Sequence, residues 1–231
     1  HRDLRRQRQM CIRDRIESAE SNILNYEYLY NGSGVAIGDI NNDGLPDIFM
    51  GGNFFGGRLF LNKGDLHFEQ ISETAGVFFE GFTTGVSFVD INGDGYDDIY
   101  MCRSKSSNPD ERRNILLINN QDLTFTNMAE EYGIDDPGFA TNAIFFDYDN
   151  DDDLDLYVLN HRTDFKNAVI IPINGEALPY EQSDMNYTSD RLYENVGEEF
   201  KDVSEEAGIV NNRFGLGCLL YTSPSPRDRS L

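Results

Sequence analysis

The sequence predicts an all-β fold, namely part of a β-propeller with about three four-stranded blades and the start of a fourth. Three observations predict it. Short apolar runs alternate with Asp-, Asn- and Gly-rich turns. An acidic segment recurs, beginning at Asp39, Asp90 and Asp147, with spacings of 51 and 57 residues. A second motif follows each copy, in which an aliphatic-Asn pair leads to Phe and then to a Glu-containing segment that ends in Gly.

Each repeat is expected to contain four strands in a fixed order. An apolar strand precedes the acidic loop, a second strand follows it, and a hairpin formed by the aliphatic-Asn strand and the Phe strand completes the unit. Four-stranded units at this period bury their faces against their neighbours, as propeller blades do. The repeats are predicted at about 31–80, 81–137 and 138–210, with a truncated fourth from 211.

The segments with the pattern Glu-x-Ala-Gly predict one helical turn each. Gly76, Gly133 and Gly208 stand where that turn should stop, because Gly accepts the left-handed conformation of a helix end. The third repeat also contains roughly twenty extra residues, within 161–190. This excursion is interpreted either as a recognition loop or as a structural flap over its blade.

The two ends differ in composition from the rest. Residues 1–15 are rich in Arg, and residues 218–231 form a Pro/Ser-rich tail. One short DNA, read on opposite strands, encodes both Met10–Arg15 and Cys218–Thr222, and both ends resemble translated sequencing adapters. We therefore expect 1–15 and 218–231 to be non-native scars that flank a propeller fragment, 16–217, and exclude them from fold reasoning. Cys102 then remains alone, so no disulfide framework is predicted.

The chain is strongly acidic. It has 41 Asp and Glu against 19 Lys and Arg, a net charge of −22. Nucleic acid is a poor partner for such a surface, because phosphate binding needs clustered Lys and Arg. No apolar run approaches the ~20 residues of a membrane-spanning helix. The acidic side chains therefore either form a solvated surface or surround cations.

The acidic segments share the pattern Asp-x-Asn/Asp-x-Asp-Gly-x-x-Asp, whose residues are numbered here as positions 1 to 9. Oxygen ligands at positions 1, 3, 5 and 9 of a tight loop, with the carbonyl of position 7, can converge on one Ca²⁺. One Ca²⁺ is expected per loop, three in all. The expected ligands are Asp39, Asn41, Asp43, Leu45 and Asp47 in the first loop, Asp90, Asn92, Asp94, Tyr96 and Asp98 in the second, and Asp147, Asp149, Asp151, Asp153 and Asp155 in the third.

Two alternatives compete with this interpretation. An EF-hand needs a bidentate Glu at position 12, where Met50, Met101 and Val158 stand, and its flanks should be helical rather than strand-like. The other alternative is that Asp, Asn and Gly only form turns on an acidic surface. Three such loops in register favour metal binding.

The third loop departs from the pattern by placing Asp152 at position 6, where the other loops have Gly. Asp enters the left-handed region more readily than most residues, so a strained turn is expected. The mutation of one loop is expected to leave the others unaffected, on the assumption that adjacent blades do not share loops.

These motifs resemble the FG-GAP/VCBS repeats of integrin-α type, and most closely those of bacterial surface proteins similar to cartilage acidic protein, which often end in an ASPIC/UnbV domain. The resemblance covers about residues 30–217 and is strongest at 145–150 and 154–158. It implies a calcium-binding propeller, extracellular, cell-surface or periplasmic, that serves adhesion or binds a ligand. The signal peptide and the remaining blades of the chain would lie outside this sequence.

The predicted function is a non-catalytic, extracellular Ca²⁺-binding module that binds a protein or a glycan. His1, His67 and His161 stand in no nucleophile or metal motif, and no phosphate-cradling loop occurs. The alternative is a fragment of a propeller-type polysaccharide lyase or hydrolase that uses calcium. A pocket in the excursion would favour this enzyme, and its expected lining is Arg162, Asp164, Tyr180, Glu181 and Asp184.

Overall fold

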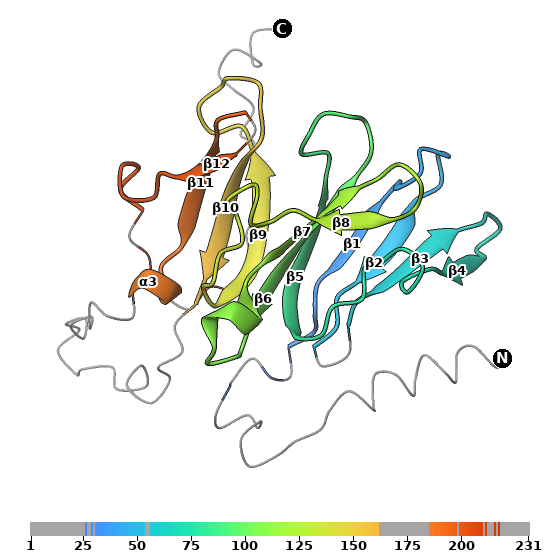
Figure 1. Ribbon diagram of the computed structural model, residues 1–231, viewed down its shortest axis with the longest axis horizontal. Helices are drawn as coiled ribbons and strands as arrows, with labels where there is room; N and C mark the ends of the chain where they lie inside the picture. The colour runs from blue at the N-terminus through green and yellow to red at the C-terminus, as the bar shows by residue number, and fades with distance from the viewer. Residues whose placement is uncertain are drawn as a thin grey trace, which may run out of the picture.

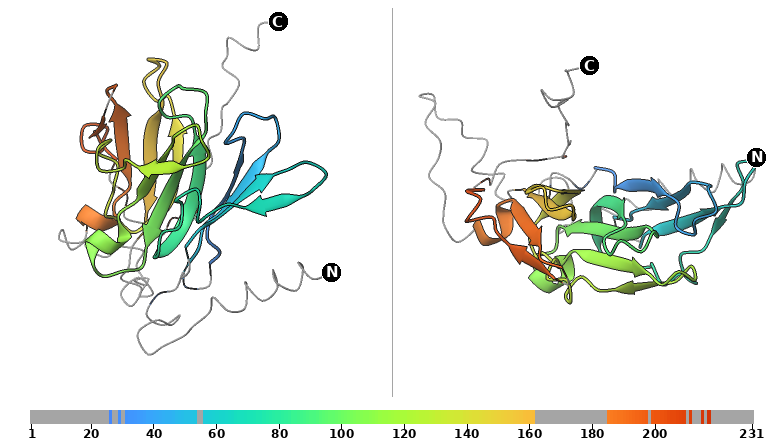
Figure 2. Two further views of the ribbon diagram at one scale, coloured as in Figure 1. Left: turned by 45° about the vertical axis from the view of Figure 1, so that its right-hand side comes forward. Right: turned by 90° about the horizontal axis from the view of Figure 1, so that it is seen from above.

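Three antiparallel sheets of four strands each make up the body of the protein (Figure 1). The computed structural model describes residues 26, 29, 31–53, 56–161, 185–197, 199–209, 211, 215 and 217. Within these residues the sheets stand side by side in chain order, and Figure 2 shows them fanning out as neighbouring blades. The predicted all-β fold of three four-stranded propeller blades is confirmed.

The strands follow each other across each blade in sequence order. The first blade holds β1 (Val35–Gly38), β2 (Asp47–Met50), β3 (Arg58–Asn62) and β4 (Phe68–Gln70). The second holds β5 (Phe82–Val89), β6 (Asp98–Ser104), β7 (Ile115–Asn119) and β8 (Phe125–Asn127). The third holds β9 (Ala140–Phe146), β10 (Asp155–Asn160), β11 (Arg191–Asn195) and β12 (Phe200–Asp202).

The strand register places the acidic loops equivalently. The last residue of the first strand pairs with the Asp at position 9 in every blade: Gly38 with Asp47, Val89 with Asp98, and Phe146 with Asp155. Each loop is therefore a closed connection between two paired strands, and its ends are held by the sheet.

The core lies between the blades, because successive side chains of a strand point to opposite faces. In β6, Ile99 and Met101 join the apolar cluster shared with the first blade, whereas Tyr100 and Cys102 join the cluster shared with the third blade. All four are fully buried or nearly so. The middle blade is thus buried on both faces, which explains the continuous apolar run in its sequence.

The predicted helical turns are present, and each ends at the expected glycine. Val77 N–H donates to the Ser72 carbonyl and Gly76 N–H to the Glu73 carbonyl, the hydrogen-bond pair that defines a Schellman motif. The same pair recurs at Gly133 and Gly208, and all three glycines have φ between 70° and 72°. The turn also joins blades, because Phe125 N–H donates to the Ala75 carbonyl at 3.0 Å.

Among the described residues, two single-turn helices were not expected from the sequence. They are η2 (Pro109–Arg112), in the loop between β6 and β7, and α3 (Met185–Thr188), before β11. The buried guanidinium of Arg112 lies over the rings of Phe139 and Tyr187, 4.1 and 4.8 Å from their centroids. These contacts attach η2 to the third blade.

Several expectations concern residues outside the described ranges. They include the proposed scars at 1–15 and 218–231, residues 162–184 of the excursion, and nearly all of the truncated fourth repeat. The residues expected to line an enzyme pocket, Arg162 to Asp184, belong to this group. Among the described residues, no helix has the length and apolar character needed to cross a membrane.

Candidate metal centre

The acidic loops connect the first and second strands of each blade and lie at one end of the molecule (Figure 1, top). They span 39–46, 90–97 and 147–154 between the paired strands. The fold thus gathers the loops, which are more than 50 residues apart in sequence, on one strongly acidic face.

The first two loops have the same internal hydrogen bonds. In the first, the Asp39 carboxylate accepts the Asp43 N–H at 3.1 Å and the Gly44 N–H at 2.7 Å, and the Asn41 amide oxygen also accepts the Asp43 N–H. The second loop repeats these contacts with Asp90, Asn92, Asp94 and Gly95. The oxygens of positions 1 and 3 therefore converge on the N–H of position 5, at the concave side of an exposed turn.

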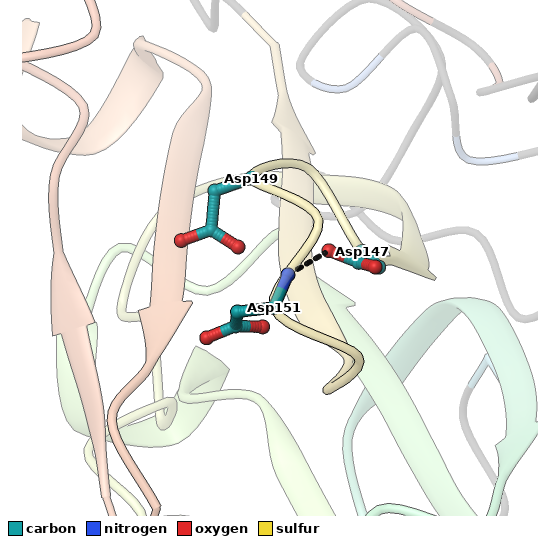
Figure 3. Close-up of side chains that lie close together, drawn as sticks. All are labelled: Asp147, Asp149 and Asp151. Carbon is teal, nitrogen blue, oxygen red and sulfur yellow. Dashed lines mark hydrogen bonds between the residues drawn. The ribbon is translucent and has the colours of Figure 1, made fainter.

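The third loop brings three carboxylates together (Figure 3). Oxygens of Asp147, Asp149 and Asp151 lie within 4.8 Å of one another, and all three residues are exposed. Ca²⁺ binds oxygen at about 2.3–2.6 Å, so two oxygens on one ion are separated by at most about 5 Å. Asp152, at position 6, has φ 76°, close to the values of Gly44 and Gly95, which confirms the expected left-handed turn.

Position 9 has a different environment from positions 1, 3 and 5. Asp47, Asp98 and Asp155 are at most 1% exposed. Both oxygens of each carboxylate accept a backbone N–H; for Asp98 the donors are Ile91 and Asn119, at 3.2 and 2.7 Å. In the third loop, Asp155 does not belong to the group of described carboxylates whose oxygens lie within 4.8 Å of one another. The buried carboxylate at position 9 thus holds the backbone of the loop from within the fold.

Burial changes the acidity of these carboxyl groups. It raises the pKa of Asp98 to about 7, although the two N–H donors act in the opposite direction, and it raises the pKa of Asp47 for the same reason. A cation near the loop would favour the charged form.

Position 7 supplies one feature that the pattern did not predict. Leu45, Tyr96 and Asp153 each donate a backbone N–H to the carboxylate at position 5, which holds the turn closed. The side-chain oxygen Oδ1 of Asp153 is buried and has no hydrogen-bond partner. Desolvation and the neighbouring Asp151 and Asp155 raise the pKa of Asp153 to about 6. The third loop therefore has a carboxyl group at position 7, in addition to the carbonyl expected at this position.

The Asn of each aliphatic-Asn pair turned out to hold the acidic loop in place, a role that sequence reasoning missed. Asn62 donates its backbone N–H to Asp47 at 2.7 Å and its amide N–H to the Pro46 carbonyl at 3.0 Å, while its amide oxygen accepts the Gly64 N–H. Asn119 and Asn195 make the equivalent contacts. The recurrence of Asn at an equivalent place after each loop was the sequence signal that could have revealed this role.

The first and second loops contact each other, although each belongs to its own blade. The Asp39 N–H donates to Oδ2 of Asp97 in the second loop at 3.1 Å, and the Asn42 side chain donates to the Gly95 carbonyl at 2.7 Å. Hydrogen bonds therefore connect the first loop to the second.

These residues fit a calcium ion. The donors are hard oxygens, and three carboxylates of the third loop have the spacing of one coordination shell. The unpartnered Asp153 oxygen belongs to the same loop but not to this group. When bound, Ca²⁺ would neutralise the loop carboxylates. Positions 6 and 9 hold the backbone of the loop, and the side-chain oxygens of positions 1, 3 and 5 face solvent.

A second polar cluster involves His161. Its Nε2 lies 3.2 Å from the Ser104 hydroxyl and 3.3 Å from the Tyr26 hydroxyl, and Tyr26 donates to Ser104 at 3.0 Å. All three side chains are buried, and the Phe82 and Phe139 rings pack nearby. This Ser-His pair is enclosed in the fold.

Comparison with known proteins agrees with this architecture. Residues 39–101 match the FG-GAP-like repeat family. The matched segment runs from the first acidic loop through the second and into β6. The chain is also 31% identical over 133 residues to cartilage acidic protein 1 of Xenopus tropicalis. That alignment covers 56% of this chain, and the chain spans about a fifth of the length of this relative.

Over residues 39–101, the comparison agrees with the FG-GAP-like repeat that the motifs resemble. The expected bacterial origin, surface location and following ASPIC/UnbV domain are not shown by these matches.

Proposed function

We propose that this chain is a calcium-binding part of a β-propeller, with about one Ca²⁺ held by each acidic loop. The observation that carries the proposal is the convergence of Asp147, Asp149 and Asp151, whose oxygens lie within 4.8 Å of one another. The equivalent hydrogen bonds in the first two loops extend it to the whole set. The proposed ligands are the side chains of positions 1, 3 and 5 with the carbonyl of position 7. Position 9 is proposed as a further ligand through the lone pairs that remain after its two oxygens accept backbone N–H groups.

The proposed biological role is non-catalytic binding of a protein or glycan outside the cell. It is supported by the FG-GAP-like repeat match and by the likeness to cartilage acidic protein 1. Calcium would contribute by fixing the loops of the acidic face in one conformation. The remaining blades of a complete propeller would be supplied by the same chain. The proposed repeats span about 31–80, 81–137 and 138–210, and a further one begins at 211. The sequence at 1–15 and 218–231 is proposed to be non-native.

Calcium should raise the melting temperature of the protein, because a ligand that binds only the folded state stabilises it. At a hundredfold excess over the dissociation constant the gain is about 2.7 kcal/mol per site. The melting temperature would be measured in CaCl₂, in MgCl₂ and in a chelator. We expect Ca²⁺ to raise it, the chelator to remove the gain, and Mg²⁺ to act less strongly because it dehydrates reluctantly. A melting temperature unaffected by Ca²⁺ would refute the proposal.

A further inference from the structure

The junction between the first and second loops is built around Asp97, at position 8 of the second loop. Its carboxylate accepts the backbone N–H of Asp39, the residue at position 1 of the first loop. A Cβ atom at position 38 would overlap the Asp97 carboxylate, so Gly38 provides the space in which it lies. Asp97 thus holds the backbone of a proposed ligand that belongs to the neighbouring blade.

Two further hydrogen bonds cross the same junction. Asn42 donates its side-chain N–H to the Gly95 carbonyl at 2.7 Å. Asn119 donates its side-chain N–H to the Ile40 carbonyl at 2.8 Å, and its backbone N–H to Asp98 at 2.7 Å. Because Ile40 N–H donates to Asp47 at 3.0 Å, a continuous path of hydrogen bonds connects the aspartates at position 9 of the two loops.

The junction between the second and third loops is different. Leu154 takes the place of Asp97, Gly93 that of Asn42, and Val89 that of Gly38. Leu154 packs against the apolar cluster that contains Val89 and Ile91. Across residues 90–98 and 147–155, all of which are described, no hydrogen bond joins the two loops. The protein therefore contains a polar and an apolar version of the same junction.

We propose that Asp97 is a positioning residue for the first cation site, so that the first and second loops take up cations as a coupled pair while the third loads independently. This inference rests on the proposed function. A cation that orders the second loop fixes Asp97 and Gly95, and these fix the backbone of Asp39 and Asn42. The first loop then loses less conformational entropy when it binds its own cation. By linkage, the first site favours the second to the same extent.

The test follows each loop separately by NMR during a CaCl₂ titration of the ¹⁵N-labelled chain. The Gly44 and Gly95 amides report on the first and second loops, because each donates to the carboxylate at position 1 of its own loop. A salt concentration of about 0.15 M screens the repulsion between bound cations at separations beyond about 8 Å. Asp94→Ala disables the second site and should raise the Ca²⁺ midpoint of Gly44 about tenfold, within the range of about 5–150-fold typical of coupled sites.

The matched control applies the same change one blade further. Asp151→Ala disables the third site and removes one carboxylate from the loop next to the second loop. The Ca²⁺ midpoint of Gly95 should nevertheless stay within about twofold of its value in the unaltered chain, a smaller change than is typical of coupled sites. Equal shifts in the two experiments, or no shift of Gly44 in Asp94→Ala, would overturn the coupling.

Two variants test the role of Asp97 itself. In an Asp97→Leu background, which copies Leu154 of the third blade, Asp94→Ala should no longer move the Gly44 midpoint. Asp97→Asn keeps an acceptor for the Asp39 N–H and should keep the coupling. If Asp97→Asn behaves like Asp97→Leu, the hydrogen-bond role is wrong and the charge acts instead. If no loop amide responds to Ca²⁺ in the unaltered chain, the proposed function fails, and the inference fails with it.

Discussion

The aspartates of each loop differ in burial, and this separates two roles within one motif. Those at positions 1, 3 and 5 of the third loop are exposed, whereas Asp47, Asp98 and Asp155 are enclosed and satisfied by backbone N–H groups. The buried residue joins the loop to the third strand of its blade, and the exposed residues are free to meet a cation. A sequence pattern that treats them as equal ligands describes only half of this arrangement.

In metal-free protein the two kinds of aspartate should contribute differently to stability. Asp98→Ala should lower the free energy of unfolding by about 2–4 kcal/mol, because it leaves the Ile91 and Asn119 N–H groups without their acceptor. Asp94→Ala should cost about 1 kcal/mol or less, because the hydrogen bonds that its carboxylate accepts from Asn92, Tyr96 and Gln121 are exposed to solvent. Urea denaturation in a chelator measures both. Equal costs would show that position 9 has no structural role of its own.

Among the elements of the fold, the Schellman turns of the first two blades each contact the fourth strand of the next blade. Phe125 N–H and Phe200 N–H each donate to the turn of the preceding blade, at 3.0 and 2.8 Å. The turn is therefore part of the blade junction as well as a local chain reversal, and the space around its glycine differs between blades.

That difference predicts an order of stability for three Gly→Ala variants. All three glycines need a positive φ, so each alanine should cost about 1 kcal/mol. A Cβ atom at Gly133 would lie 3.0 Å from the Phe200 carbonyl oxygen, one at Gly76 would lie 3.6 Å from that of Phe125, and one at Gly208 meets nothing within 4 Å. Urea unfolding should therefore rank Gly133→Ala as most costly, by about 1 kcal/mol over Gly208→Ala. The reverse order would contradict the role of the turn at the junction.

At the scale of the whole molecule, the first blade has an apolar face that its neighbours in the structure do not cover. Val35, Ile37 and Met50 are 55%, 66% and 41% exposed, and the pairing of β1 with β2 puts them on one face. The residue of the second blade that corresponds to Met50 is Met101, which is completely buried against the first blade. The exposed face thus has the composition of a blade interface.

This face should make the chain self-associate. Ile37→Lys places a charge at its centre and is expected to shift the protein toward monomer, because desolvating an unpaired charge in an interface is costly. Leu66→Lys is the control, since Leu66 is 93% exposed but lies in the turn between β3 and β4, away from this face. Sedimentation velocity measures the distribution. If Leu66→Lys dissociates the protein as well as Ile37→Lys does, the face is not the cause.

The repeats in the sequence predicted the blades, the loops and the terminal glycines because these features depend on local pattern and recur three times. Asp152 at a positive φ was also predictable, since it occupies the position of a glycine in the other loops. Contacts between units were not predictable in this way. The pair Gly38 and Asp97 differs from Val89 and Leu154, and only the packing of one blade on the next shows that these residues meet. Burial of position 9 likewise depends on the third strand of the blade, whose Asn stands 15 residues after Asp47, 21 after Asp98 and 40 after Asp155.

Counting the Ca²⁺ ions bound per chain shows whether the three acidic loops are calcium sites. Equilibrium dialysis of the metal-free chain against CaCl₂, followed by metal analysis, should give about one Ca²⁺ per loop, or three per chain. Asp151→Ala should reduce the count by one, because it removes a member of the carboxylate group in the third loop. A chain that binds no Ca²⁺ above the background of the buffer, or a count that Asp151→Ala leaves unchanged, would contradict the account.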